Sequence, residues 1–159
     1  MKYLRWLIED VLRIDGRALV SEDEAGFVSR LRLQKAAYLL KRMGVEPFTK
    51  YSFTIYLRGP YSPELAKEYY GEVGEEKEKP GITAEKLELL KWFVEHDEKW
   101  LEIASSILSI LEDYPDISYD ELFSLLRMSK PWITREKLDE IYRELEERSL
   151  VGKQTVLVS

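Results

Sequence analysis

The sequence predicts a mainly α-helical protein with a short β element in its first lobe and a winged-helix-like second lobe. Most apolar residues recur at the spacing of one helix face. One stretch, residues 51–57, instead alternates apolar and polar side chains, which is typical of a half-buried strand. A charged, glycine-containing run at residues 71–81 reads as a solvated connection, so we expect lobes at residues 1–80 and 81–159.

Two helices are expected at the start of the chain. The first covers residues 2–14 and ends at Asp15-Gly16, and a polar loop follows at residues 21–26. The second covers about residues 28–43, with Gly44 as its C-terminal cap. Its spacing predicts an inner face of small and aliphatic side chains, namely Leu33, Ala36, Ala37 and Leu40. Three basic side chains are expected outside that face, namely Arg32, Lys35 and Arg42.

The predicted strand runs into a turn and a third helix. Its expected inward side chains are Tyr51, Phe53, Ile55 and Leu57. Gly59-Pro60 should end the strand. Ser62 should then cap a helix that has Pro63 at its first position, where a missing N–H costs nothing.

The second lobe should contain further helices. Thr83 is a suitable N-cap, and the polar triplet at residues 96–98 interrupts an apolar face, which predicts two helices with a break between them. Ser118 and Glu121 have the spacing of a capping box for a helix to about residue 128. Thr134 should cap a last helix to about residue 148, and one or two short strands should follow at residues 150–159. The helical spacing predicts one shared core, made of Leu108, Leu111, Leu122, Leu125, Leu138, Ile141 and Leu145.

Composition narrows the functional classes. The net charge of −6 disfavours a general nucleic-acid binder, whose footprint is a basic excess. Charge interrupts every apolar run, and Glu9 and Asp10 precede any apolar leader, so we expect a cytoplasmic protein without a membrane segment. The absence of asparagine and the abundance of Glu, Lys and Tyr favour a thermophilic source.

The sequence indicates no catalytic, metal or cofactor site. It has no cysteine, and His96 is its single histidine. Glu95, His96 and Asp97 are consecutive, and consecutive residues on a helix point in different directions, so they cannot converge on one ion. We interpret His96 as a surface residue near a helix break. Neither a nucleophile elbow nor a phosphate-binding glycine loop is present.

One candidate binding surface joins the second helix to the strand and turn. Arg and aromatic residues are enriched at the centres of interfaces. We therefore select a partner-binding set of Arg32, Lys35, Arg58, Tyr61 and Glu64. An alternative interpretation is architectural: Gln34 and Lys35 brace the turn, and Tyr61 packs against the helix.

A second candidate lies in the last third of the chain. Three helices followed by a Leu-Val-Gly turn and a short apolar strand are the order of a winged helix-turn-helix, whose third helix reads DNA. Here that helix, residues 135–148, has more acidic than basic side chains. A net negative reading helix repels phosphate, so this pattern favours the fold more than DNA binding.

Three short motifs resemble a known family. They are Leu33, Gln34 and Lys35; Tyr56, Gly59 and Pro60; and Glu121, Leu122, Pro131 and Trp132. Together they resemble the Panacea, or SocA-like, antitoxin domain and the related YwgA-like uncharacterised proteins. Panacea sequences commonly have a Trp shortly before Gly-Pro, where this chain has Ile55-Tyr56. The resemblance implies structural roles for Gln34, Tyr56, Gly59, Pro60, Ser62, Pro131 and Trp132.

The resemblance also implies a class of function. Some Panacea members are antitoxins that bind a toxin or deliver it to a protease, whereas the YwgA-like branch implies no settled function. The resulting hypothesis is a non-catalytic protein-binding regulator, antitoxin-like or adaptor-like, that uses the surface from Lys35 to Glu64. The alternative is a transcriptional regulator that binds DNA through the second lobe.

Overall fold

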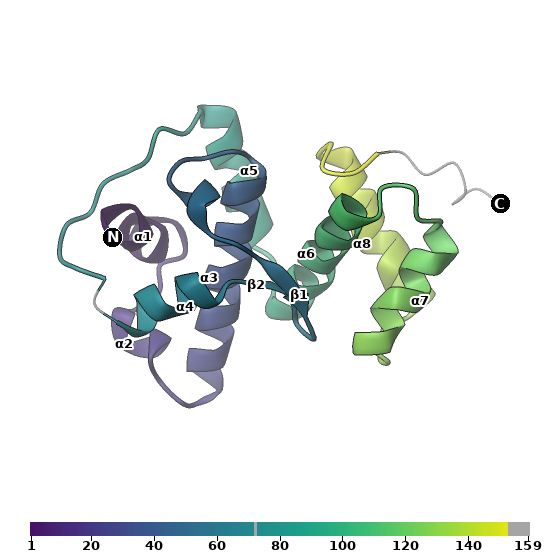
Figure 1. Ribbon diagram of the computed structural model, residues 1–159, viewed down its shortest axis with the longest axis horizontal. Helices are drawn as coiled ribbons and strands as arrows, with labels where there is room; N and C mark the ends of the chain where they lie inside the picture. Colours follow the sequence, from purple (N-terminus) through teal and green to yellow (C-terminus); the bar gives the residue numbers. More distant parts are fainter. Residues whose placement is uncertain (72, 153–159) are drawn as a thin grey trace.

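A computed structural model describes residues 1–71 and 73–152, and it is mainly helical (Figure 1). The described part contains eight α-helices: α1 Lys2–Trp6, α2 Gly16–Leu19, α3 Glu24–Arg42, α4 Pro63–Tyr70, α5 Ala84–Val94, α6 Glu98–Asp113, α7 Tyr119–Ser129 and α8 Arg135–Glu147. The other elements are a π-helix η1 Leu7–Val11, a 3-10 helix η2 Phe48–Lys50 and the strands β1 Thr54–Tyr56 and β2 Gly59–Tyr61. Within these described residues no helix is both long and apolar enough to cross a membrane.

Helix α3 lies at the centre of the fold and contacts α2, α5, α6 and β2. The predicted inner face is confirmed, because Leu33, Ala36, Ala37 and Leu40 are fully buried. The helix starts earlier than predicted because the Asp23 side chain accepts a hydrogen bond from the Gly26 N–H at 3.0 Å. Gly44, with φ of +74°, ends it as predicted.

The first predicted helix is α1 followed by η1, a wider π-turn. The charged connection then runs along it. The Glu78 N–H donates to the Lys2 carbonyl at 3.2 Å, and the N-terminal amine donates to the Val73 carbonyl at 2.7 Å. The connection is mostly exposed, as predicted, but these contacts fix it against α1.

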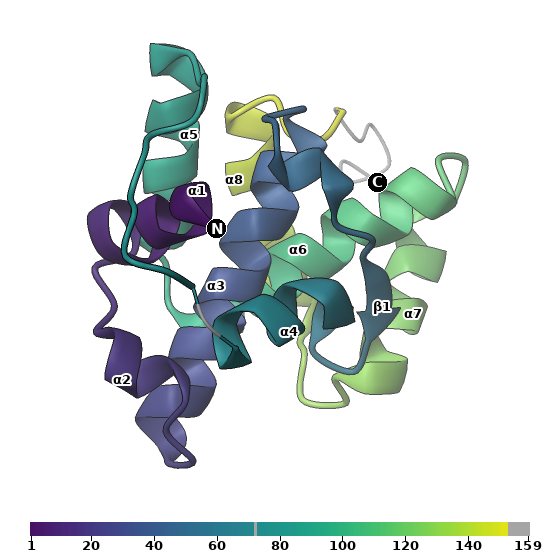
Figure 2. The same cartoon turned by 60° about the vertical axis from the view of Figure 1, so that its left-hand side comes forward.

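The strand prediction was wrong in its extent, and its burial pattern is confirmed only for Tyr51, which is buried, and Phe53, which is partly buried. Gly59-Pro60 does not end a strand but belongs to β2, which pairs antiparallel with β1 in the register Ile55 to Pro60. Strand β2 packs against α3 and α6, which leaves β1 on the outside (Figure 2). Ile55 and Leu57 are therefore exposed, by 45% and 72%, although alternation predicted them inside.

The helix boundaries of the second half agree with the predictions. Asp97 starts α6 after the predicted break, and its carboxylate accepts from the Trp100 N–H at 2.9 Å. Ser118 and Glu121 form the complete capping box, and Thr134 caps α8. These signals succeed because capping depends only on residues within one helical turn.

The predicted core of the second half is largely confirmed. Leu111 is partly buried, and five of the predicted side chains are buried, namely Leu108, Leu122, Leu138, Ile141 and Leu145. Leu125 is instead 37% exposed, and its neighbour Leu126 takes the inward place. The predicted strands at residues 150–159 lie, from residue 153 onward, outside the described residues, so the winged-helix lobe stays a prediction.

Candidate functional site

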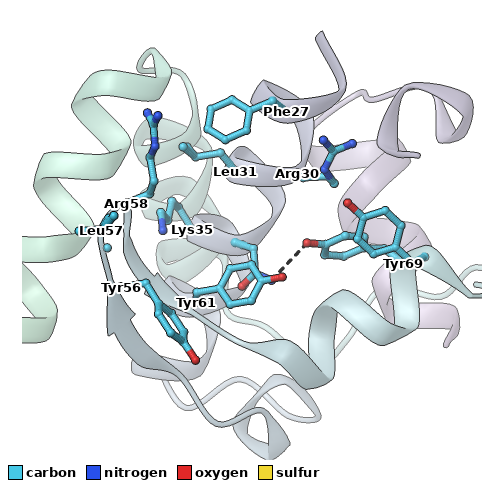
Figure 3. A pocket seen from close by; sticks show the side chains of 12 residues that line it. Phe27, Arg30, Leu31, Lys35, Tyr56, Leu57, Arg58, Tyr61 and Tyr69 are labelled. Atoms are coloured by element: carbon cyan, nitrogen blue, oxygen red, sulfur yellow. Dashed lines mark hydrogen bonds between the residues drawn. The ribbon is translucent and has the colours of Figure 1, made fainter. Parts of the chain in front are cut away.

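A pocket of about 410 Å³ lies between α3, α4 and the β1–β2 hairpin (Figure 3). Its lining combines aromatic rings with basic side chains and contains no carboxylate. The lining residues are Phe27, Arg30, Leu31, Gln34, Lys35, Tyr56, Leu57, Arg58, Gly59, Tyr61, Tyr69 and Tyr70. We call this the hairpin pocket.

Helix α3 supplies one wall of the hairpin pocket. Its five lining residues fall at helical spacing on one face, namely Phe27, Arg30, Leu31, Gln34 and Lys35. Across from that face, Tyr56 and Tyr61 from the two strands meet edge to face, with ring centroids 5.6 Å apart. Helices and strands thus build most of the walls, and the hairpin turn adds Leu57 and Arg58.

Gln34 holds the end of the hairpin to α3. Its Nε2 donates to the Ser62 carbonyl at 2.9 Å, and its Oε1 accepts from the Ser62 N–H at 2.9 Å. Nε2 also lies 3.3 Å from the Tyr69 hydroxyl, a contact drawn in Figure 3. Ser62 in turn caps α4 through the Leu65 N–H at 3.2 Å. One buried amide therefore fixes both the hairpin and the start of α4.

Lys35 is buried beneath the hairpin, with only 2% of its surface exposed. Its ammonium group donates to the Pro60 carbonyl at 2.8 Å. Burial lowers the pKa of Lys35 to about 7, against the opposing charge of Glu102. The expectation that Lys35 lies outside the packed face was wrong, because the hairpin covers it.

A second buried lysine holds the turn of the hairpin. Lys130 follows α7, and its Nζ donates to the Leu57 carbonyl at 3.0 Å and lies 3.6 Å from the Glu102 carboxylate. Burial lowers the pKa of Lys130. Arg58 reaches the other oxygen of Glu102, 3.5 Å from its Nη1. The Glu102 carboxylate thus lies between two basic groups from separate elements.

Gly59 is required where the hairpin meets α6. Its φ is +97°, a conformation that L side chains rarely adopt. An added Cβ would lie 2.8 Å from Ser106 Oγ, 3.1 Å from Ser105 Oγ and 3.3 Å from Lys35 Nζ. The glycine therefore permits the close approach that buries the Lys35 amine.

Two arginines flank the hairpin pocket. Arg58 has a side chain 57% exposed, and its guanidinium lies over the Phe27 ring at 4.9 Å. Arg30 lies at the opposite end, where its Nη1 donates to the Leu19 and Ser21 carbonyls at 2.9 and 2.6 Å. These contacts place positive charge at both ends of the pocket.

The structure separates part of the predicted partner-binding set. Lys35, Arg58 and Tyr61 come together in the hairpin pocket. Arg32 instead donates to the Val94 carbonyl at 3.1 Å, at the end of α5. Glu64 accepts from the Ser52 N–H at 3.0 Å, outside the pocket lining.

Five exposed apolar side chains lie on the hairpin and on the segment at the end of α7, which Lys130 joins to the hairpin turn. In both ribbon views this turn lies beside the C-terminal end of α7, where Lys130 contacts Leu57 (Figure 1, Figure 2). The exposed fractions range from 45% to 79% for Ile55, Tyr56, Leu57, Met128 and Trp132. We call these five residues the hairpin patch. Lys99 lies over the Trp132 ring at 4.2 Å, so the patch has a basic margin.

His96 is not the simple surface residue that we expected. Its ring stacks on Trp100 with centroids 3.6 Å apart, and its Nδ1 lies 3.1 Å from the Phe93 carbonyl. Its Nε2 lies 3.6 Å from the Glu144 carboxylate. Because these contacts join α5, α6 and α8, His96 has a packing role at the helix break. Among the described residues no group of three potential ligands is arranged to hold a metal.

Several residues of this region were missed by sequence reasoning. Phe27, Arg30 and Leu31 share the helical spacing of Gln34, so extending that face toward the start of α3 would have found them. Glu102 interrupts an otherwise apolar stretch of α6, which is a weak signal of a buried pair. Nothing near Lys130 in the sequence indicates its contact with Leu57.

No family model, curated protein or solved structure matches the chain.

Proposed function

We propose that this chain is a non-catalytic protein-binding regulator that presents the hairpin patch to a partner. The observation that carries the proposal is the presence of five exposed apolar side chains on two segments that Lys130 joins, the hairpin and the region at the end of α7. Large exposed apolar groups are concentrated where proteins bind other proteins. The antitoxin-like or adaptor-like role implied by the resemblance needs such a surface and no reaction.

The anchoring of the hairpin supports this proposal. Gln34 and Lys35 hold it from α3, and Lys130 holds its turn from beyond α7. A surface that is fixed before binding loses little conformational entropy when a partner docks. The two-stranded hairpin can thus present Leu57 and Tyr56 in a defined position.

Charge at the margin indicates the chemistry of the partner segment. Arg58 and Lys99 are exposed beside the apolar side chains of the patch. A complementary segment has apolar residues flanked by acidic ones. The acidic residues of such a segment are repelled by the other surfaces of this chain, whose net charge is −6, so the segment should favour the basic margin of the patch.

DNA binding receives less support from the same structure. The basic residues at the start of α8 are already paired with carboxylates. Arg135 lies 3.0 Å from Asp120, and Lys137 lies 3.5 Å from Glu140. Pairing of this kind reduces the positive potential that attracts phosphate.

Site-directed photocrosslinking in the native host tests the proposal. A crosslinker at Met128 should capture a defined protein, whereas a crosslinker at Val20, which is 51% exposed beyond the hairpin patch, should not. The captured protein is then purified and titrated against Met128→Asp and Val20→Asp variants. Met128→Asp should weaken binding at least tenfold with an unchanged melting temperature. Equal capture at both positions, or equal affinity of both variants, would contradict the proposal.

A further inference from the structure

The lining of the hairpin pocket has a marked bias in charge. The chain contains 30 acidic and 24 basic residues, yet the pocket lining has three basic side chains and no acidic one. The remaining lining is dominated by aromatic rings. A cavity with this composition favours a ligand that has an apolar body and a negative charge.

The shape of the pocket defines the place of that body. Figure 3 shows Phe27 and Leu31 facing Tyr61 and Tyr56 across the space, with Arg58 and Lys35 at one end and Arg30 at the other. Rings that face each other in this way accommodate a flat group by stacking or edge contact. The volume of about 410 Å³ is within the range of small-molecule pockets.

The basic end of the pocket can accept an anion without leaving a charge unpaired. Arg58 contacts Glu102 at 3.5 Å, and Lys130 contacts the other oxygen of that carboxylate at 3.6 Å. If Arg58 turns toward a ligand, Lys130 still compensates the buried carboxylate. The planar guanidinium can then bind a carboxylate through two parallel hydrogen bonds.

We propose that the hairpin pocket binds a small aromatic carboxylate, with its ring between Phe27 and Tyr61 and its carboxylate on Arg58. The pocket shares Tyr56 and Leu57 with the hairpin patch, whereas Met128 and Trp132 of that patch do not line it, so the two binding proposals can be tested apart at Met128. A single carboxylate suits the pocket better than a phosphate does, because the walls are largely apolar and a doubly charged group loses more hydration.

Lys35 gives the binding a characteristic pH dependence. The charged groups that act on its amine are Glu102 from α6 and Lys130 from beyond α7, and Arg58 contacts the same Glu102 carboxylate. With a pKa of about 7, the amine is largely neutral above pH 7. A carboxylate bound nearby raises that pKa, so binding should take up a proton and weaken as the pH rises from 7 to 9.

Calorimetric titration with indole-3-acetate tests the site. We expect saturable binding to the unmodified chain, with at least tenfold weaker binding of the neutral indole-3-acetamide. Arg58→Met should weaken indole-3-acetate binding at least tenfold. Arg127→Met is the matched control, because Arg127 also lies over a phenylalanine ring, 5.7 Å away, but does not line the pocket. This variant should bind like the unmodified chain.

Further measurements separate the proposal from its competitors. Repeating the titration in buffers of different ionisation enthalpy measures proton uptake on the unmodified chain, so no Lys35 variant needs to fold. The proposal is overturned by equal affinity for the acid and the amide, by an Arg58→Met variant that binds normally, or by the absence of proton uptake at pH 8. Tighter binding of phenyl phosphate than of indole-3-acetate would also overturn it.

Discussion

Gln34 and Ser62 exchange two hydrogen bonds of 2.9 Å, one in each direction, although 28 residues separate them. The side-chain amide of Gln34 satisfies the backbone N–H and carbonyl of Ser62, as a neighbouring strand would do in a sheet. Both partners are buried. The end of the hairpin therefore depends on one side chain of α3.

Replacing Gln34 by Leu should destabilise the protein strongly. The substitution leaves the Ser62 N–H buried without a partner, at about 1 to 3 kcal/mol, whereas the Ser62 carbonyl keeps the hydrogen bond from the Ala66 N–H at 3.1 Å. We expect the free energy of unfolding to fall by about 1 to 3 kcal/mol in urea denaturation. Glu24→Gln, in the exposed first turn of the same helix, is the control and should cost less than about 1 kcal/mol. Equal effects of the two substitutions would contradict the role of Gln34.

Gly59→Ala should lower the free energy of unfolding by more than the strain of a positive φ alone. Gly44 also has a positive φ, but an added Cβ there would meet nothing within 4 Å. Gly44→Ala should therefore cost about 1 to 2 kcal/mol, which is the strain of a left-handed residue. At Gly59 the contact with Ser106 should add about 1 to 3 kcal/mol. Thermal unfolding of both variants, and of Gly59→Ala combined with Ser106→Ala, checks this: the second substitution should recover part of the loss.

Lys35 should make stability depend on pH above neutrality. Its pKa is about 7 in the folded protein and near 10.5 when unfolded. Between these values the unfolded chain binds more protons, so the free energy of unfolding should rise with pH, by up to about 1.4 kcal/mol per unit. Lys35→Met removes this contribution. Urea denaturation at pH 7, 8 and 9 should thus show a slope in the unmodified chain that is reduced in the variant, and parallel slopes would refute the assignment.

Truncation should destabilise the protein much more at Leu126 than at Leu125. Leu126 is 1% exposed, whereas Leu125 is 37% exposed. Leu126→Ala creates a cavity and should cost about 2 to 5 kcal/mol. Leu125→Ala should cost less than about 1 kcal/mol, since surface changes have small effects. Chemical denaturation of the pair decides the matter, and a larger loss at Leu125 would mean that α7 is rotated about its axis.

Local sequence signals predicted the helices well. Thr83, Ser118 and Thr134 each start a helix where they were expected, because their side chains bond within the next turn. The inner face of α3 was equally predictable from spacing. Leu125 was misassigned because periodicity locates an apolar face only to within about one residue, and Leu126 fits the same face.

The candidate site was predicted only in part, for a reason that lies in tertiary structure. Alternation cannot show which strand of a hairpin lies against the helices, so Ile55 and Leu57 were placed inside. Lys35 is buried because the hairpin folds over it. The sequence of the helix alone therefore does not predict that burial lowers the pKa of the Lys35 amine. Lys130 reaches Leu57 across 73 residues, a distance at which no local pattern operates.

That long reach has a consequence for synthesis of the protein. Chains are made from the N-terminus, so Leu57 leaves the ribosome well before Lys130 does. Until then the Leu57 carbonyl lacks the Lys130 ammonium group that donates to it. A nascent chain that stops short of residue 130 should therefore hold its hairpin only through Gln34 and Lys35, with the turn at Leu57 unanchored. The arrangement described above thus forms only after synthesis has continued past α7, which delays partner recognition until that point.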